Sequence, residues 1–553
     1  MQKNMALRLT PAEAANPAWV QNYLAQELGI TAERIHGFFV EKESIDARSR
    51  QQVWINKTIR VFVDEPFTER PRQIISFPSV HHAAKKVIIV GAGPAGLFAA
   101  LALIEKGIQP IILERGKAVR ERRRDLAKLN KEGIVNSDSN YCFGEGGAGT
   151  YSDGKLYTRS TKRGNVNRIL QLFVQFGADE KILYQSHPHI GTNKLPHIIT
   201  AMRQQIIDAG GACYFEQRVV DFLIVNYQIK GVRTANHAVW EADAVILATG
   251  HSARDIFHLL FQKQIAIAAK PFALGVRVEH PQAVIDAIQY HCPLPNAQQT
   301  ETNRDPHLPP AAYSLVEQVN GRGVFSFCMC PGGIIAPAAT SPNELVVNGW
   351  SPSKRNNPFA NSGMVVQVSE ADAFHWLQQH KNWYREQQDA VPIASSNSTL
   401  QQHPLVLLYF QQWVEQQAYA AGGGQFVAPA QRLVDFSQNK TSTSLPACSY
   451  IPGLQSVYLK NVLPGFIHQS LQQGFKHFGK KMKGYFTNEA VVVAAESRTS
   501  SPVRIPRNTE TLQHPHIENL YPCGEGAGYA GGIVSAAIDG ELVANTIALR
   551  WMQ

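Results

Sequence analysis

The chain has 553 residues, of which 44% are hydrophobic and 18% charged, a balance that excludes a disordered or fibrous protein. This length exceeds one compact core and predicts about three or four domain-sized units. The 53 Lys and Arg against 44 Asp and Glu give a net charge of +9, which permits an anionic cofactor, nucleic acid or acidic lipid without selecting one. The seven cysteines are odd in number and mostly isolated, so a reducing compartment is favoured over a disulfide scaffold.

The first 80 residues predict a small α+β unit. Helical spacing of apolar residues covers Pro17–Leu28, and residues 35–40 and 54–63 have the composition of strands. The proline-containing stretch 66–82 predicts a linker. No secretory signal is recognised in the first thirty residues, and we expect a cytoplasmic protein.

One charge-free stretch, Val87–Ile104, reaches the length of a membrane span. Three glycines and Pro94 in its first half would break a helix there, so we predict a buried strand, a turn and a buried helix, with no membrane span.

Three copies of the pattern G-x-G-x-x-G occur, and the first has the context of a dinucleotide-binding turn. It follows the β-branched run 87–90 and precedes an Ala- and Leu-rich helix over 97–104. Gly91 permits the tight turn, Gly93 lets the backbone approach a pyrophosphate, and Gly96 lets helix and strand pack closely. A second strand ends at Glu114, 23 residues after Gly91. We expect this carboxylate to bind the adenosine ribose hydroxyls and to disfavour NADP.

The other two copies of the pattern indicate further segments that could contact the same ligand. The second, within 143–155, predicts a loop whose amides line an anion or flavin edge, or only a connecting loop. The third runs from the strand 519–523 into a helix over 532–551, whose positive end would face the flavin pyrimidine. An independent second nucleotide site is the alternative there. Three separated segments, with the turn 248–250, favour FAD over NAD as the bound cofactor.

Several strings resemble an uncharacterised FAD-dependent dehydrogenase/oxidoreductase family of glutathione-reductase-like, two-domain flavoproteins. They lie at 114–117, 119–122, 144–156, 326–333, 348–349 and 521–539. The resemblance implies an α/β fold with a Rossmann-like FAD-binding domain, an inserted α+β substrate-side domain and a small N-terminal α+β domain. The expected boundaries are 1–80, 85–265, 266–510 and 511–553, and residues 270–505 look irregular.

The fingerprint and the resemblance together imply a set of FAD contacts. These are Gly91, Gly93, Pro94, Ala95, Gly96, Glu114, Arg115, Gly146, Gly147, Val219, Ala248, Thr249, Gly250, Gly524, Glu525, Gly532 and Ile533.

Candidate catalytic groups are few, because the isoalloxazine itself accepts a hydride. Cys328 and Cys330 lie two apart on an expected strand over 323–330, so both thiols would face one side, as a redox or acid–base pair or merely as packing. Lys155 could stabilise the reduced flavin or make a surface salt bridge. No metal site is expected, because a zinc ion would need two further ligands near the cysteines.

A basic cluster on an expected helix, from Lys117 to Lys128, raises the possibility of RNA binding with help from 480–483. Interspersed acids make a solvated face the better interpretation, so a nucleic-acid partner is unlikely. We expect an FAD-dependent oxidoreductase that passes hydride or electrons between FAD and an unidentified organic substrate or NAD(P)H. The alternatives are a flavin-dependent RNA-modifying protein and a flavoprotein with structural or redox-sensing FAD.

Overall fold

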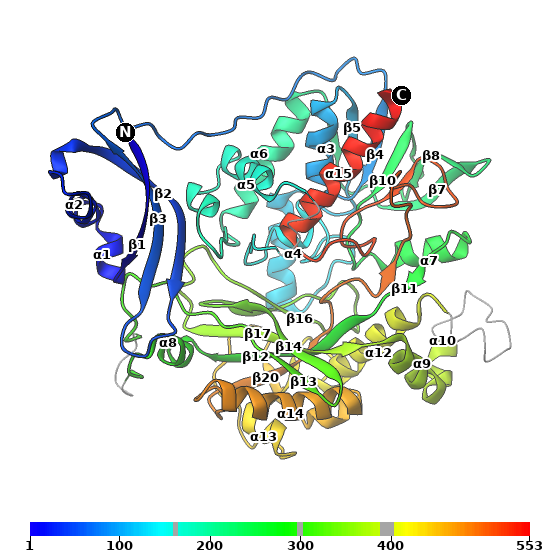
Figure 1. Cartoon of the computed structure of the whole chain (residues 1–553). Helices are drawn as coiled ribbons and strands as arrows, with labels where there is room; N and C mark the ends of the chain where they lie inside the picture. The colour runs from blue at the N-terminus through cyan, green and yellow to red at the C-terminus, as the bar shows by residue number, and fades with distance from the viewer. Residues whose placement is uncertain (159–163, 296–301, 387–402, 553) are drawn as a thin grey trace.

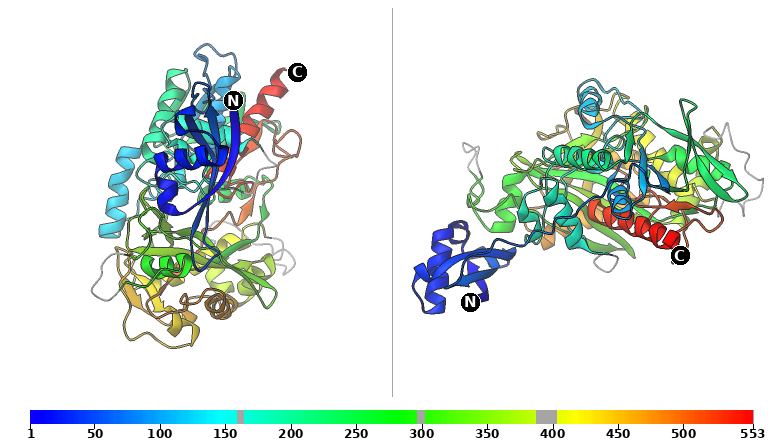
Figure 2. Two further views of the ribbon diagram at one scale, coloured as in Figure 1. Left: turned by 60° about the vertical axis from the view of Figure 1, so that its left-hand side comes forward. Right: turned by 90° about the horizontal axis from the view of Figure 1, so that it is seen from above.

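The computed structural model describes residues 1–552, apart from 159–163, 296–301 and 387–402. The described elements form three bodies: an N-terminal body of residues 1–63, a body built on a parallel sheet and a body built on a large antiparallel sheet (Figure 1). Seen from above, the N-terminal body stands out to one side (Figure 2). The predicted α/β class is confirmed.

The N-terminal body is a three-stranded antiparallel sheet with two helices against one face. Its strand order is β1-β3-β2, and Leu9, Leu24 and Ile59 lie in the core between sheet and helices. The predicted helix is confirmed as α2: Asn16 caps its first amides, and Gly29 ends it with a φ of 65°. The elements are β1 (Gln2–Leu9), α1 (Pro11–Ala15), α2 (Pro17–Leu28), β2 (Ile35–Asp46) and β3 (Trp54–Val63).

Residues 64–85 contain no helix or strand and connect the N-terminal body to the parallel sheet (Figure 1). The segment is fixed to its surroundings along its path. The backbone N–H and C=O of Ile75 both bond the Gln175 side chain, at 2.9 and 2.8 Å, and the Val80 amide donates to the Ala209 carbonyl.

The charge-free stretch 87–104 forms a buried strand, a turn and a buried helix, as predicted. Strand β4 is central in a five-stranded parallel sheet of order β22-β10-β4-β5-β6. Helix α3 (Pro94–Glu105) is buried from Ala95 to Ile104 because α15 (Ile533–Met552) packs along it. Among the described helices, none combines the length and apolar character needed to cross a membrane. The strands are β4 (Lys86–Val90), β5 (Gln109–Leu113), β6 (Ala212–Tyr214), β10 (Ala244–Leu247) and β22 (Leu520–Pro522).

The remainder of the parallel-sheet body consists of helices and a small antiparallel sheet of order β7-β8-β9. The apolar run 219–225 forms β7 of this small sheet. The elements are α4 (Val119–Glu132), α5 (Val166–Gln175), α6 (Leu195–Asp208), β7 (Val219–Val225), β8 (Gln228–Thr234), β9 (Val239–Glu241) and α7 (Arg254–Gln262).

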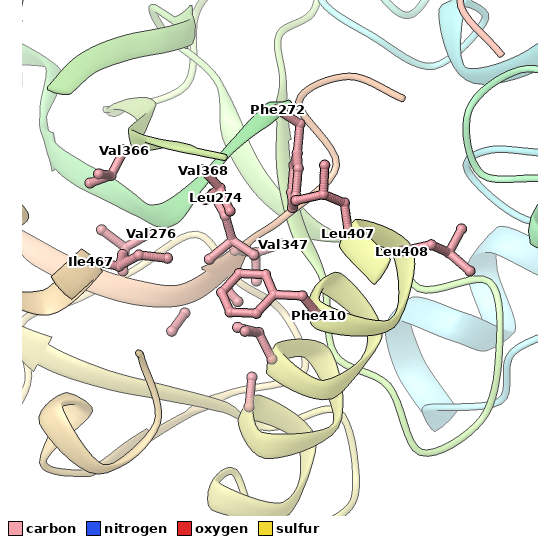
Figure 3. Packing of buried hydrophobic residues seen from close by; sticks show 14 of the residues in the cluster. Phe272, Leu274, Val276, Val347, Val366, Val368, Leu407, Leu408, Phe410 and Ile467 are labelled. Carbon is pink, nitrogen blue, oxygen red and sulfur yellow. The ribbon is translucent and has the colours of Figure 1, made fainter. Parts of the chain in front are cut away.

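The antiparallel-sheet body is more regular than the sequence suggested. Seven strands join in the order β13-β14-β17-β12-β20-β18-β19. Its core packs Phe272, Leu274 and Val276 of β12 against Phe410 and neighbouring apolar residues of α12 (Figure 3). Glycine- and proline-rich loops between the strands gave the irregular sequence pattern.

The strands of this body are β11 (Ala268–Ala269), β12 (Phe272–Pro281), β13 (Val316–Val319), β14 (Arg322–Cys330), β15 (Ile334–Pro337), β16 (Val347–Trp350), β17 (Phe359–Val368), β18 (Ala428–Arg432), β19 (Leu454–Ser456), β20 (Val491–Glu496) and β21 (Val503–Arg504). Its described helices are α8 (Gln282–Tyr290), α9 (Glu370–Gln379), α10 (Lys381–Glu386), α12 (Val406–Ala421), α13 (Leu433–Ser437) and α14 (Gly465–Lys481).

Candidate functional site

A cavity of about 380 Å³ is bounded by the turns that follow β4, β5 and β10, the glycine-rich loop 142–157, and residues 327–328 and 498–499 of the antiparallel-sheet body. The segment 525–533 completes its wall. Ligands of open parallel sheets bind at this carboxyl edge of the strands.

The glycines of the first turn divide into two kinds. At Gly91, with a φ of 108°, a Cβ would lie 2.5 Å from the Ala248 carbonyl oxygen, and at Gly96 it would overlap the Gly91 carbonyl. These two glycines therefore serve close packing. Gly93, at the N-terminus of α3, has nothing within 4 Å of its Cβ position and leaves space for a ligand beside the helix amides.

Glu114 is buried at the end of β5 and ties two turns together. Its Oε2 accepts a hydrogen bond from the Ala92 amide at 2.8 Å, and its Oε1 accepts from the amides of Gly116 and Gly144 at 2.9 Å. The carboxylate also lines the cavity. Its contact with a ribose stays a prediction, and its structural role in joining the turns was not foreseen.

Arg115 follows it and lines the same cavity. Its guanidinium lies over the Phe143 ring at 4.1 Å and pairs with Asp138 and Asp255 at 2.7 and 2.8 Å. These contacts hold a flat, cationic surface at the end of the cavity beyond β5.

The glycine-rich loop is held by a buried arginine. Arg122 of α4 is fully buried and donates to the carbonyl oxygens of Asn140, Tyr141, Glu145 and Gly147 over 2.8–3.0 Å. The predicted solvated face of the basic helix is therefore wrong at Arg122: this side chain is satisfied inside the protein by loop carbonyls.

The C-terminal segment beside the cavity is held by the ion pair between Arg507 and Asp539. The Gly524 amide donates to Asp539 Oδ2 at 2.7 Å, and Arg507 pairs with Asp539 at 2.6 Å. Glu525, next in the chain, lines the cavity. Burial raises the pKa of Glu525 to about 7, against the lowering effect of Lys270, so this carboxyl exchanges a proton near neutral pH.

The wall nearest the antiparallel sheet contains the cysteine pair and Lys155. The expected strand through the cysteines is confirmed as β14. Its pairing with β17 shifts between Phe327 and Cys330, and Cys328 has a φ of 48°, so the alternation that would place both thiols on one side is broken there. Cys328 lines the cavity, whereas Cys330 is fully buried. Lys155 Nζ donates to the Met329 carbonyl.

These groups shift one another's ionisation. The pKa of Cys328 lies below its usual range, chiefly because the Cys330 thiol hydrogen-bonds to it and further because of Lys155 and Arg277. The same hydrogen bond raises the pKa of Cys330. Burial lowers the pKa of Lys155, but the two cysteines and Asp153 outweigh burial and raise it. The wall thus favours a thiolate at Cys328 beside an ammonium.

We expect Cys330→Ala to raise the pKa of Cys328, because the variant lacks the neighbouring thiol that lowers it; the Cys330 Sγ itself donates to the Cys328 carbonyl oxygen at 3.3 Å. Alkylation of Cys328 by iodoacetamide at about pH 7 should then slow several-fold, since only the thiolate reacts. Peptide mass spectrometry over a pH series measures this rate. Cys213 serves as a control, because burial raises its pKa to about 12 and it should stay unmodified in both proteins. An unchanged rate at Cys328 would contradict the influence of the Cys330 thiol on the Cys328 pKa.

Most of the predicted cofactor contacts line this cavity, and their contact with FAD stays a prediction. Those in the lining are Gly91, Gly93, Pro94, Ala95, Glu114, Arg115, Gly147, Val219, Ala248, Thr249, Gly250, Glu525, Gly532 and Ile533. Gly96, Gly146 and Gly524 lie behind the lining. Sequence reasoning missed Asp153, His251, Asn348 and Thr499, which also line it. Asp153 and Asn348 stand inside strings that carry the family resemblance, but His251 and Thr499 have no local motif.

The shape of the cavity fits FAD. Four lining glycines, Gly93, Gly250, Gly531 and Gly532, have nothing within 4 Å of their Cβ positions. They belong to the turn after β4, the turn after β10 and the segment before α15, so three separated parts of the chain leave open space for one ligand. The N-termini of α3 and α15 offer free amides at two of these places.

Family models match three parts of the chain. Residues 84–127 match an FAD binding domain, residues 271–499 match an FAD-dependent protein, C-terminal domain-like, and residues 1–62 match a domain of unknown function. The two FAD models show FAD as the cofactor, in agreement with the sequence prediction.

Among solved structures, the chain is 10% identical to CtdE in complex with FAD, covering 84% of each chain with a TM-score of 0.29. It is 13% identical to glycine oxidase from Bacillus cereus, covering 85% of this chain and 96% of the other with a TM-score of 0.28. At these scores the likeness supports no conclusion about activity.

One curated relative covers nearly the whole chain. It is an uncharacterised protein from Clostridium beijerinckii, 36% identical over 545 residues, which span 96% of this chain and 95% of the relative. The protein belongs to the same family as this clostridial relative, and its matched domains make it an FAD-dependent protein.

Proposed function

We propose that the protein is an FAD-dependent oxidoreductase in which an organic substrate or a transiently bound NAD(P)H exchanges a hydride or electrons with the cofactor. The turns after β4 and β5 would hold the adenosine and pyrophosphate, and the segment 525–533 would hold the flavin end. FAD, when bound, accepts a hydride at its isoalloxazine ring and gains negative charge there.

One observation supports redox work over a purely structural cofactor: two sources of positive potential line the same cavity. Lys155 contributes an ammonium group, and residues 531–533 form the N-terminus of α15, where the helix dipole is positive. With the isoalloxazine against this wall, as proposed, both would stabilise the negative charge that reduction adds to it, and a cavity that only stored a cofactor would gain nothing from that effect. Glu525, with its raised pKa, can hold or release a proton in the same wall.

Anaerobic spectroscopy of the purified protein tests the proposal. Addition of NADH or NADPH is expected to bleach the flavin band near about 450 nm, and candidate organic donors can be screened in the same way. A bound flavin that neither nicotinamide nor any organic donor reduces would contradict the proposal and favour the structural or redox-sensing alternative.

Lys155→Met is expected to lower the flavin reduction potential by about 30 mV, which corresponds to a tenfold change in the equilibrium constant of a two-electron couple. The reason is that the variant removes a cation from the wall where reduction adds negative charge. Potentials can be measured by anaerobic equilibration with reference dyes, without knowledge of the natural donor.

Lys155→Arg keeps the charge and should keep most of the potential. Lys263→Met is the matched control, because Lys263 is similarly exposed, at 34% against 35% for Lys155, and pairs with Asp221 away from the cavity. Equal potentials in Lys155→Met and Lys263→Met would remove Lys155 from the proposed role.

A further inference from the structure

A second, larger cavity of about 1730 Å³ lies between the N-terminal body and the antiparallel-sheet body, and we call it the interbody cleft. It is lined by residues 43–48 of the N-terminal body, the segment 185–189 and the C-terminal part of α8. The end of α14 and the loop after it, together 480–489, also line it. The matched domain models assign no role to it.

The walls of the interbody cleft are held in place by direct contacts. Glu43 of β2 exchanges backbone hydrogen bonds with Tyr184 and Ser186, at 2.9 and 3.0 Å. On the other side, Val53 and Ile55 pack with Leu308 in a small apolar cluster. The N-terminal body is therefore joined to the other walls of the cleft by specific contacts.

Its lining carries an excess of cations that the protein does not neutralise. Three of its basic residues are ion-paired: Arg48 with Asp46, Lys481 with Glu317 and Arg355 with Asp153. Among the described residues, no carboxylate lies within 4.0 Å of the cationic groups of the remaining three. These are Arg50, Lys480 and Lys483.

The acids of the lining do not cancel this charge. Glu43 pairs with Lys57 at 3.4 Å, and Glu489 is the one lining carboxylate without an ion-pair partner in the described part of the chain. Arg50, Lys480 and Lys483 are exposed, and a cleft lined by an excess of one sign of charge raises the local concentration of ions of the opposite sign.

The interbody cleft adjoins the FAD cavity across a single layer of chain. Lys155 and His189 pair in an isolated β-bridge; Lys155 lines the cavity and His189 lines the cleft. Likewise Arg355 of the cleft wall pairs at 2.8 Å with Asp153 of the cavity wall. The two spaces are thus neighbours.

The linings of the cavity and of the cleft also meet at two aromatic rings. Tyr157 lines the cavity with 56% of its surface exposed, and its ring lies 5.3 Å from the ring of His187, which lines the cleft. These two rings therefore mark a second place, besides the Lys155–His189 bridge, where the cleft and the cavity adjoin.

We propose that the interbody cleft binds an anionic group, a phosphate or a carboxylate, of the molecule that reacts at the flavin. Arg50, Lys480 and Lys483 bind this group, and the reacting end extends past Tyr157 and His187. The N-terminal body thereby completes the substrate site by closing one wall and supplying Arg50. That the bound molecule is the substrate rests on the proposed function; the anion site itself does not.

Isothermal titration calorimetry of the FAD-bound protein with pyrophosphate and with citrate tests the site, at about 50 mM salt to limit screening. We expect saturable binding of at least one of the two probes. The double variant Lys480→Glu/Lys483→Glu should weaken it at least about tenfold, because attraction becomes repulsion. Binding of pyrophosphate alone would identify a phosphate ligand, and binding of citrate alone a carboxylate ligand.

The matched control is Lys128→Glu/Lys131→Glu, which reverses two exposed lysines three residues apart on α4, outside the cleft. It should leave binding unchanged. Arg50→Ala, which changes the N-terminal body, should weaken binding as well. This variant tests the site independently if the double variant misfolds. No binding of either probe, or equal weakening in the control, would overturn the anion site. Because calorimetry needs no electron transfer, failure of the proposed redox function would leave this result intact.

Discussion

Gly93→Val should yield a folded protein that has lost FAD. The backbone at Gly93 has a φ of −74°, which any residue adopts, and nothing lies within 4 Å of its Cβ position, so the fold accepts the side chain. The same space adjoins the first amides of α3, where a pyrophosphate would lie. The variant is therefore expected to purify without the absorption near about 450 nm that marks oxidised flavin.

Gly465→Val is the matched control. Gly465 also stands at the start of a helix, α14, and also has nothing within 4 Å of its Cβ position, but it lies outside the cavity. It should retain full flavin content. Thermal melting of both variants without FAD would separate cofactor loss from misfolding. A yellow Gly93→Val protein with one FAD per chain would place the pyrophosphate elsewhere.

The βαβ unit could be predicted from the sequence because its signals are local. The apolar run, the glycine spacing and the acidic residue at the end of the next strand each arise from the chemistry of one short segment. Gly91 and Gly96 meet their neighbours as the fingerprint requires. FAD followed from the same reasoning, because three such segments have to converge on one ligand.

The errors occurred where distant residues decide the local structure. The strand through the cysteines was predicted correctly, but regular alternation, which would place both thiols on one side, fails because the register with β17 shifts there. Arg277 reaches the Cys328 carbonyl at 3.4 Å while bonding Asn361 at 2.6 Å. Arg122 was predicted to be a surface charge, because its acceptors are backbone carbonyl oxygens of a loop, which the side chains of the sequence do not reveal. The interbody cleft likewise depends on how the N-terminal body docks.

A buried ion-pair network joins the parallel-sheet and antiparallel-sheet bodies, and it too had no sequence signature. Glu415 of α12 is fully buried. Its Oε2 accepts from Arg254 of α7 at 2.8 Å and from Arg498 at 2.9 Å, and its Oε1 accepts from Ser497 at 2.6 Å. Since Arg498 also lines the FAD cavity, the network supports one wall of the site.

Glu415→Ala should therefore be among the most destabilising single substitutions in the chain. It leaves two arginines with less compensation away from water, and removing one partner of a buried ion pair typically costs about 3–5 kcal/mol. Glu415→Gln, which keeps the volume and loses the charge, should cost somewhat less. Urea unfolding followed by circular dichroism measures both. Asp64→Asn is the control, because it removes the charge of the exposed Arg34–Asp64 pair, keeps a residue type that tolerates the φ of 53° at this position, and should cost less than about 1 kcal/mol.

The pH dependence of the unfolding free energy tests whether the charge of Glu415 causes this stabilisation. Burial alone would raise the pKa of Glu415, but Arg254 and Arg498 lower it to about 2, whereas an unfolded glutamate titrates near about 4.3. A carboxyl whose pKa is lower in the folded state stabilises the fold above the unfolded pKa, and that contribution disappears as the pH falls through the folded pKa. The difference in unfolding free energy between wild type and Glu415→Gln should thus be full at neutral pH and shrink between about pH 4 and pH 2. A difference that stays constant over this range would show that packing, and not the paired charge, holds the two bodies together.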